Sequence, residues 1–182
     1  CEIMMAVKSG RAIRFPESKV RPTGRGAIGV SGIDLDEEND EVVGMICVNK
    51  DDKSKTVLVV SEKGFGKRTF LDDPETGENN YRITNRGGKG VKTINVTAKT
   101  GSLVGLLAVT EKEDLMITCV SGVTIRMPVN QISEQGRATQ GVKLIKVDEG
   151  DAIAAITQLE EKEDENGHAE DTVNETTETP ES

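Results

Sequence analysis

The sequence is poor in aromatic residues and in histidine. It contains no Trp, one Tyr and three Phe. Its single His, His168, lies in a polar segment with no Cys nearby, so a zinc site or histidine-based catalysis would lack the residues it needs. Because large aromatic side chains are scarce, Val, Ile, Leu and Met must form the core. The one tyrosine, Tyr81, lies in a polar stretch and is predicted to belong to a surface loop.

Long apolar runs and a cysteine framework are also missing. Nothing approaches the roughly 20 consecutive apolar residues that a membrane span requires, and the start does not resemble a signal peptide. The cysteines, Cys1, Cys47 and Cys119, are far apart, and the last two are expected to be buried thiols rather than disulfides or metal ligands. We therefore expect a cytoplasmic protein with no membrane contact, no metal and no cofactor. A start at Cys1, inside an apparent strand, indicates a fragment.

The charge is distributed unevenly. The net charge is -9, from 23 basic and 32 acidic residues. Residues 160–182 contain ten of the acidic residues and one basic residue, so this tail carries the entire net charge and the body is balanced. Such a composition predicts disorder, because it offers too little apolar surface to offset the entropy of ordering. The tail is either an inert solubilising chain or an anionic competitor for a basic surface.

The sequence contains three internal repeats. Gapless alignment of Gly10, Gly64 and Gly122 superposes an apolar segment before each glycine and places an Arg four residues beyond each one. A strand, a glycine turn and a second strand explain this pattern. The repeats are assigned to residues 1–51 and 52–111, with the third at 112–159.

Each repeat then continues with a basic, glycine-bearing loop, at residues 24–30, 85–91 and 136–142. Each loop has an Arg four residues before its last Gly and leads to two apolar residues spaced by two, as in a half-buried strand. A nearly continuous apolar segment closes each unit. Helix is the competing interpretation of that segment, but its Val and Ile content favours a buried strand.

The repeats therefore predict an all-β fold of about three blades, each with four antiparallel strands. Four-stranded units with a period near 50 residues are typical of propeller-like folds. Three blades are too few to close a ring. Either further blades lie upstream, or the units stack as an open arc with an unprotected edge.

Repetition around an axis would place the loop arginines, Arg25, Arg86 and Arg137, along one outer edge. Such a row suits the regularly spaced phosphates of duplex DNA, and the neighbouring glycines allow backbone N–H groups to approach phosphate oxygens. Strand alternation also turns Arg14 and Arg126 away from the apolar face. No aromatic platform is present for single-stranded bases, which favours a bent duplex held by its backbone. The residues predicted to contact DNA are Arg14, Arg25, Lys67, Arg68, Arg86, Lys89, Lys92, Arg126, Arg137 and Lys143.

Five motifs occur together in this sequence: GRAIRF at 10–15, ESKVR at 17–21, GVSGI at 29–33, GFGKRT at 64–69 and RATQGV at 137–142. Through them the sequence resembles the C-terminal domain of the DNA gyrase A subunit, specifically the C-terminal half of that domain, over residues 1–159. The resemblance implies a β-pinwheel and a non-catalytic module that wraps duplex DNA, so that an ATP-dependent type II topoisomerase introduces negative supercoils. The implied partners are double-stranded DNA, the rest of the gyrase A subunit, and the gyrase B subunit.

The resemblance has limits. The family's signature heptapeptide, QRRGGKG, belongs to the first blade, whereas residues 85–90 retain only its RGGKG part. This implies that the complete motif lies upstream. The related C-terminal domain of topoisomerase IV stays an alternative. A propeller-like protein-interaction module is another, and it would show apolar residues at its loop tips. An enzyme on the same scaffold would need converging His, Asp or Glu side chains, and we expect no catalysis from this chain.

Overall fold

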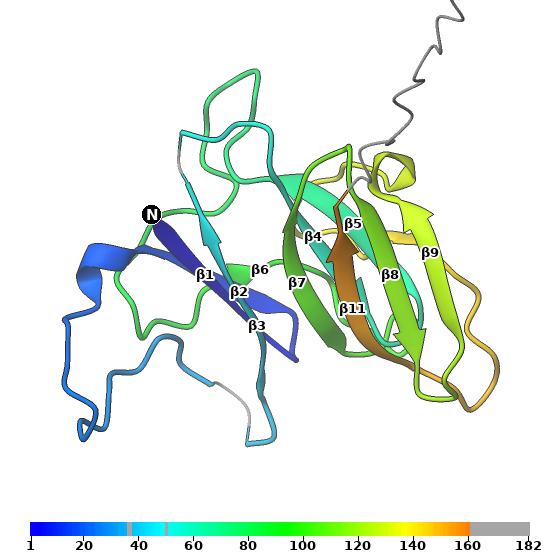
Figure 1. Cartoon of the computed structure of the whole chain (residues 1–182), viewed down its shortest axis with the longest axis horizontal. Coiled ribbons are helices and arrows are strands. Elements are labelled where there is room, and N and C mark those ends of the chain that lie inside the picture. The colour runs from blue at the N-terminus through cyan, green and yellow to red at the C-terminus, as the bar shows by residue number, and fades with distance from the viewer. Residues whose placement is uncertain (36–37, 50, 161–182) are drawn as a thin grey trace, which may run out of the picture.

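The computed structural model describes residues 1–35, 38–49 and 51–160, which form three antiparallel β-sheets lying side by side as blades (Figure 1). The predicted all-β class is confirmed. Two short 3-10 helices, η1 (Glu17–Lys19) and η2 (Val129–Gln131), follow equivalent strands of the first and third blades. No helix in the described ranges is long and apolar enough to cross a membrane. Apart from Glu160, the tail predicted to be disordered lies outside the described residues.

Each blade is built on a β-hairpin. The hairpins turn at Gly10, Gly64 and Gly122, whose φ angles of 86°, 85° and 89° are readily adopted only by glycine. The predicted strand, glycine turn and strand are therefore confirmed in all three repeats. From the inner to the outer edge, blade 1 contains β3 (Val42–Val48), β1 (Glu2–Val7), β2 (Arg11–Pro16) and β6 (Val91–Lys92).

Blades 2 and 3 repeat this order. Blade 2 contains, in the same direction, β7 (Leu103–Val109), β4 (Thr56–Ser61), β5 (Phe65–Phe70) and β10 (Val142–Lys143). Blade 3 contains β11 (Ile153–Leu159), β8 (Asp114–Cys119) and β9 (Thr124–Pro128). The inner strands lie next to each other, with β3 and β11 packing against β7.

The outer strand of a blade comes from the following repeat. Strand β6 belongs to the second repeat but pairs with β2 of blade 1, and β10 belongs to the third repeat but pairs with β5 of blade 2. The prediction that each repeat supplies all four strands of its own blade is therefore corrected. Periodicity identifies the residues that form strands, but it does not identify the partner of each strand.

The core lies mainly between the blades. One cluster joins Met4 and Val48 of blade 1 to Val57 and Leu106 of blade 2. A second cluster joins blades 2 and 3 in the same way. A third, smaller cluster lies on the other face of blade 1 and includes Phe15. Blade 1 thus has apolar side chains on both faces.

Two predictions about which side chains are buried were wrong. Tyr81 is 1% exposed, and its hydroxyl lies 2.6 Å from Thr93 Oγ1. The polar stretch folds back so that the Tyr81 N–H donates to Leu71 O. This places the ring in the core between blades 1 and 2. Burial there raises the pKa of Tyr81. Cys47 is exposed rather than buried, whereas Cys119 is buried as expected.

Candidate nucleic-acid interface

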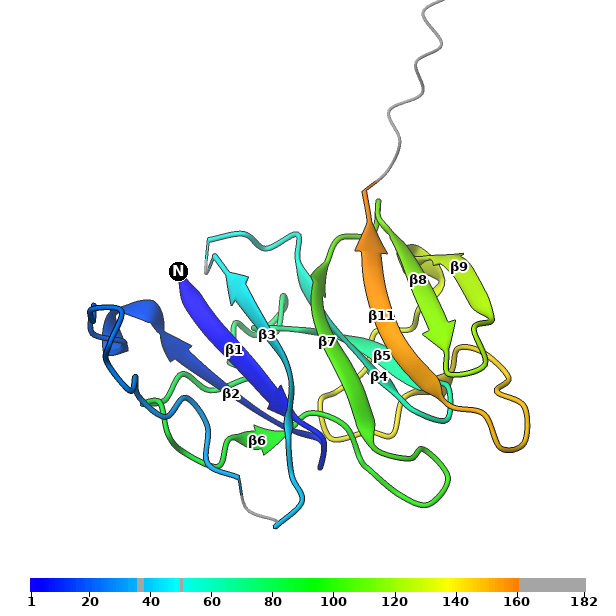
Figure 2. The ribbon, with the colours of Figure 1, turned by 60° about the horizontal axis from the view of Figure 1, so that its bottom comes forward.

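Three equivalent segments follow the hairpins of the three repeats, and the second and third of them cross to the preceding blade. We call them the edge segments: residues 23–33, 84–94 and 135–145. The second and third contain β6 and β10 and form the outer edges of blades 1 and 2 (Figure 2). The first lies beside the second, where the Gly87 N–H donates to Gly32 O at 2.7 Å. The exchange of strands thus brings the three basic loops into one row.

The loop arginines tie neighbouring edge segments together. Arg86 donates from Nη1 to Ser31 O at 3.1 Å and from Nε to Lys19 O at 3.1 Å. Arg137 donates from Nη1 to Lys92 O at 3.2 Å, and Lys92 is the residue equivalent to Ser31. Each arginine therefore binds the edge segment before its own. Arg25 has no such preceding segment among the described residues, and it is exposed.

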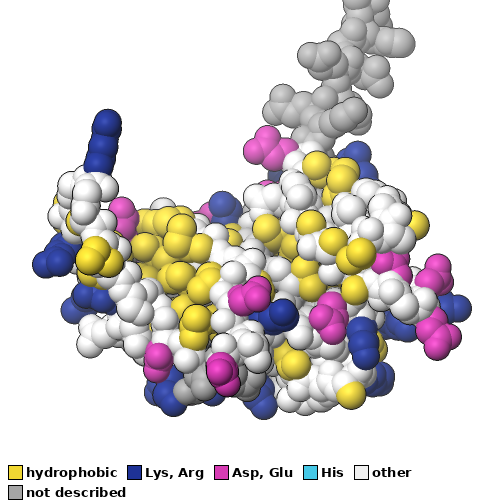
Figure 3. Space-filling model, turned by 90° about the horizontal axis from the view of Figure 1, so that it is seen from below, with side chains coloured by type: hydrophobic (Ala, Val, Ile, Leu, Met, Phe, Trp, Pro, Cys, Tyr) yellow, Lys and Arg dark blue, Asp and Glu magenta, His cyan; other side chains and the backbone are white. Residues whose placement is uncertain are grey.

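The edge segments carry cations and contain no Asp or Glu. The body as a whole has equal numbers of acidic and basic residues. All the acidic residues that balance its charge lie outside these segments. The row is therefore positive along its length, and Lys and Arg side chains lie along the lower border of the view in Figure 3. Six of the predicted DNA-binding residues lie on these segments: Arg25, Arg86, Lys89, Lys92, Arg137 and Lys143.

Arg14 is buried, so its predicted DNA contact is corrected. It is 2% exposed and donates to Asp72 Oδ1 at 2.7 Å, to Glu2 Oε2 at 2.6 Å and to Tyr81 O at 3.1 Å. Burial lowers the pKa of Arg14, but the hydrogen bonds and charges of the two carboxylates outweigh it and raise the pKa above its ordinary value. The following repeat covers the strand face that alternation predicted to be open.

Arg68 occupies the equivalent position in blade 2 and is also removed from the predicted interface. It is 3% exposed. Its Nε donates to Ile132 O at 2.8 Å, and its guanidinium pairs with Glu111 at 3.2 Å and with Glu134 at 3.4 Å. Arg126, the equivalent residue of blade 3, has a half-exposed side chain and lies 2.5 Å from Asp114 Oδ2. It stays a candidate contact.

Lys67 is the third predicted contact that the structure places in the interior. It is 0% exposed, and its Nζ donates to Gly136 O at 2.5 Å and to Thr139 Oγ1 at 3.1 Å. These two acceptors flank Arg137, so Lys67 supports the third basic loop from below. Burial, with a smaller contribution from the Arg137 charge, lowers the pKa of Lys67 to about 7.

The buried lysine predicts a pH dependence of stability. The pKa of Lys67 is about 7 in the folded chain against an ordinary value of 10.5, so the unfolded chain binds more protons between these values. The free energy of unfolding should therefore rise with pH across this window, by at most about 1.4 kcal/mol per pH unit. Urea unfolding at several pH values would measure it. Lys67→Met should show a flatter profile; identical profiles for both proteins would contradict the assignment.

Five exposed cations on or near the edge segments were missed: Lys19, Arg21, Arg82, Lys99 and Lys146. A signal for them exists in the sequence. The acid-free stretches extend beyond the aligned loops, to residues 18–33, 79–110 and 135–147. Searching for stretches without Asp or Glu, rather than for recurring arginines, would have found these residues.

Comparison with known proteins agrees with this architecture. The family described as DNA gyrase C-terminal domain, beta-propeller, matches residues 2–49, 55–73, 76–110 and 113–160. The DNA gyrase A subunit of Staphylococcus aureus strain MRSA252 is 43% identical over 169 residues, which are 93% of this chain and 18% of that protein. The DNA gyrase A subunit of strain NCTC 8325 is 44% identical over 170 residues, with the same coverage of both proteins. The chain thus spans about a fifth of the length of these curated relatives.

Solved structures show the same fold. A structure of the DNA gyrase A C-terminal domain has a TM-score of 0.71 at 28% identity, with 86% of this chain and 50% of that one covered. The C-terminal domain of DNA topoisomerase IV has a TM-score of 0.76 at 21% identity, covering 87% of this chain and 46% of that one. The second likeness concerns the fold alone. With its blades, its exchanged strands and a family match over most of its length, the chain belongs to the DNA gyrase C-terminal domain family and has its β-pinwheel fold.

Proposed function

We propose that this chain binds duplex DNA along the edge segments and holds it bent around the outer edge of the blades. The observation that carries the proposal is the row of three side-by-side segments that have cations and no acidic residue. A continuous positive edge attracts phosphates, and each neutralised phosphate releases condensed counterions. A curved edge that holds only the backbone favours bending without base reading.

The loop backbone supports the same function. Gly87 and Gly90 have φ angles of 76° and 69°, which direct the chain sharply between the cations of the second edge segment. Lys89 and Lys92 of that segment are exposed. Gly26 of the first loop and Gly136 of the third have nothing within 4 Å of a Cβ position, so a phosphate has room to approach the main-chain N–H groups there, as in other anion-binding loops. Contacts of this kind fix position on the duplex and carry no sequence information.

We further propose the setting in which this binding operates. The relatives are named as the A subunit of DNA gyrase, and the chain corresponds to a minor part of them. We infer a non-catalytic module that wraps DNA for an ATP-dependent type II topoisomerase in the cytoplasm. Its partners there are the rest of the gyrase A subunit, and the gyrase B subunit, and it has no cofactor of its own. The identity to the gyrase A subunit favours this setting over topoisomerase IV.

A propeller-like protein-interaction module is the second candidate, because one of its expected features is present. Ile28 lies at the tip of the first basic loop and is 106% exposed, and Val120 and Val123 near the β8–β9 turn are 71% and 54% exposed. These side chains lie at the two ends of the row of blades.

Binding should show a steep salt dependence. We expect the chain to bind a duplex of random sequence, with log K falling against log salt at a slope of about −0.9 for each phosphate contacted, or about −5 if all six edge-segment cations engage. A fluorescence titration at several salt concentrations would measure it. A short single strand should compete poorly, since no aromatic platform is available for its bases. A folded sample that shows no duplex binding, or a preference for the single strand, would overturn the proposal.

A further inference from the structure

Different side chains support the second and third basic loops from beneath. Under the second loop, the Ile13 side chain of β2 lies 3.6 Å from a Cβ built on Gly88. Under the third loop, β5 has Lys67 at the position of Ile13, and blade 3 has Ile125 there. Lys67 is 0% exposed. Because an apolar residue completes the other two blades, packing alone does not account for a lysine in blade 2.

Lys67 holds the main chain on both sides of Arg137. Its Nζ donates to Gly136 O at 2.5 Å and to Thr139 Oγ1 at 3.1 Å. Arg137 is half-buried, and its Nη1 donates to Lys92 O of the second edge segment at 3.2 Å. The arginine that is proposed to meet a phosphate therefore depends for its position on the lysine beneath it.

The third loop brings two cations, Lys67 and Arg137, together without a carboxylate. The pKa of Lys67 is lowered to about 7, mainly by burial and to a smaller extent by the charge of Arg137. Strand β4 contains no charged residue, and Lys92 and Lys143 of the edge segments are exposed. Tyr81 also lies near the charge of Arg137, and because burial raises its pKa it is neutral. Among the described residues, no carboxylate contributes to the pKa of Lys67.

A DNA phosphate would supply the anion that this pair lacks. Arg137 belongs to the third edge segment, and a guanidinium can bind two phosphate oxygens at once through its N–H groups. Arg137 is near enough to Lys67 for its charge to act on the lysine, so a phosphate bound to Arg137 acts on Lys67 as well. The phosphate favours the ammonium form, which is opposite to the effect of Arg137 alone.

We infer that Lys67 is a positioning residue for duplex DNA, which holds Arg137 toward a phosphate and takes up a proton when that phosphate binds. The inference rests on the proposed function, because it concerns the phosphate contact of the third edge segment. It assigns a role in DNA binding to a side chain that cannot reach the DNA itself.

The sign of the coupling follows from the charges. A phosphate at Arg137 raises the pKa of Lys67 above its value of about 7 in the free chain. Between the two values the complex binds more protons than the free chain does, so duplex affinity falls as the pH rises through this window. Below it, Lys67 is an ammonium in both states and contributes no pH dependence.

The pH dependence of duplex binding tests the inference. Fluorescence titrations of the full chain at fixed salt should show affinity falling about tenfold between about pH 7 and pH 9, if the phosphate raises the pKa by about one unit. Lys67→Ile has the residue of the other two blades and should fold, which circular dichroism would check at each pH. It should bind more weakly near neutral pH and should lack this fall. Groups that titrate in both proteins cancel in the comparison.

Proton uptake can also be measured directly. Titration calorimetry near pH 8, in two buffers of different ionisation enthalpy, gives the number of protons bound together with the duplex. Wild type should take up more protons than Lys67→Ile, by as much as about one per chain. A lysine that only supported the loop mechanically would not produce this difference.

The contact between Lys67 and the loop can be tested without changing a charge. Thr139→Val removes the hydroxyl that accepts from Lys67 Nζ and should lower duplex affinity by roughly two- to tenfold, because the loop after Arg137 loses this anchor. Thr139→Ser keeps a hydroxyl and should restore binding. The matched charge control is Lys112→Gln, in an exposed turn, which should keep the pH profile of wild type.

Two results would overturn the inference. One is wild-type duplex affinity that does not change across this pH range. The other is weaker binding by Lys67→Ile with the pH profile and the buffer dependence of wild type, which would make Lys67 a structural residue only. In both cases the duplex is still bound, so the proposed function stands. Absence of duplex binding at every pH would contradict the proposed function, and the inference with it.

Discussion

Replacing Arg25, Arg86 and Arg137 together by Gln should lower duplex affinity by about two orders of magnitude at 0.1 M salt. The three residues occupy equivalent positions on the edge segments, and each lost phosphate contact should make the slope of log K against log salt shallower by about 0.9. The loss should be similar for duplexes of different sequence, since backbone contacts do not distinguish bases. Salt titrations of wild type and variant on two unrelated duplexes would measure both effects.

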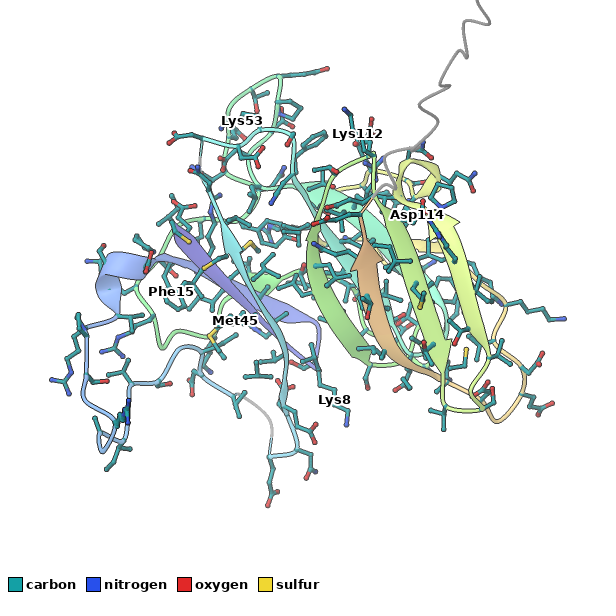
Figure 4. The ribbon with its side chains drawn as sticks, viewed as in Figure 1. Lys8, Phe15, Met45, Lys53, Lys112 and Asp114 are labelled. Atoms are coloured by element: carbon teal, nitrogen blue, oxygen red, sulfur yellow. The ribbon has the colours of Figure 1, made fainter. Side chains whose placement is uncertain are left out.

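The control for this experiment removes cations from another part of the molecule. Lys53 and Lys112 lie in exposed turns before β4 and β8, at the upper side of Figure 4. The double variant Lys53→Gln/Lys112→Gln should bind DNA nearly as well as wild type. Equal losses per removed charge in the two variants would mean that net charge, rather than the edge, governs binding. Unchanged affinity in the triple variant would refute the edge model.

Substitution of Arg14 should have its largest effect on stability. We expect Arg14→Met to lower the free energy of unfolding by about 3–5 kcal/mol, because it leaves Glu2, which is 5% exposed, and Asp72 without their buried counter-charge. It also leaves Tyr81 O without its donor. Urea unfolding followed by circular dichroism would measure the loss.

The same experiment has an internal control and a pH test. Arg126→Met, at the equivalent position of blade 3, removes a half-exposed pair and should cost about 0–1 kcal/mol. Burial raises the pKa of Asp72, but Arg14 outweighs it and holds the pKa below its ordinary 3.8. The carboxylate therefore stabilises the fold above that pH and loses this contribution as pH falls below it. The difference in the free energy of unfolding between wild type and Arg14→Met should therefore become smaller at low pH. Equal costs for the two methionine variants would contradict the structural role of Arg14.

Much of the fold could be predicted from the sequence because turns and strands leave local signals. Gly10, Gly64 and Gly122 mark the hairpins, since the positive φ of these turns restricts the residue to glycine. Strand partners could not be predicted. Val91 pairs with Ala12 across a long separation, and no local pattern distinguishes this neighbour from one in its own repeat. Tyr81 was misplaced for a similar reason, because its polar flanks conceal a side chain that turns inward.

The sequence located the candidate site at residues that both recur in each repeat and are accessible in the folded chain. The loop arginines recur because the loops do, and exchange places them along one edge. Recurrence misled at Arg14 and Arg68, because a strand residue that looks solvent-facing in its own repeat is covered by the next one. Lys67 misled differently. The other repeats have Ile13 and Ile125 at this position, which indicates that the side chain is buried. Because Lys67 is charged, it was nevertheless predicted to lie at the surface.

Strand exchange also determines how this chain must fold. In many repeat proteins each unit contacts only its sequence neighbours and can form one step at a time. Here blade 1 is incomplete until Val91 and Lys92 have been synthesised and have returned to β2, which requires closing a loop longer than a whole repeat. The high proportion of non-local pairings predicts slow folding in which the blades form together. Truncation after blade 2 would remove the outer strand of blade 2 as well as blade 3, so a cut at a repeat boundary damages two blades.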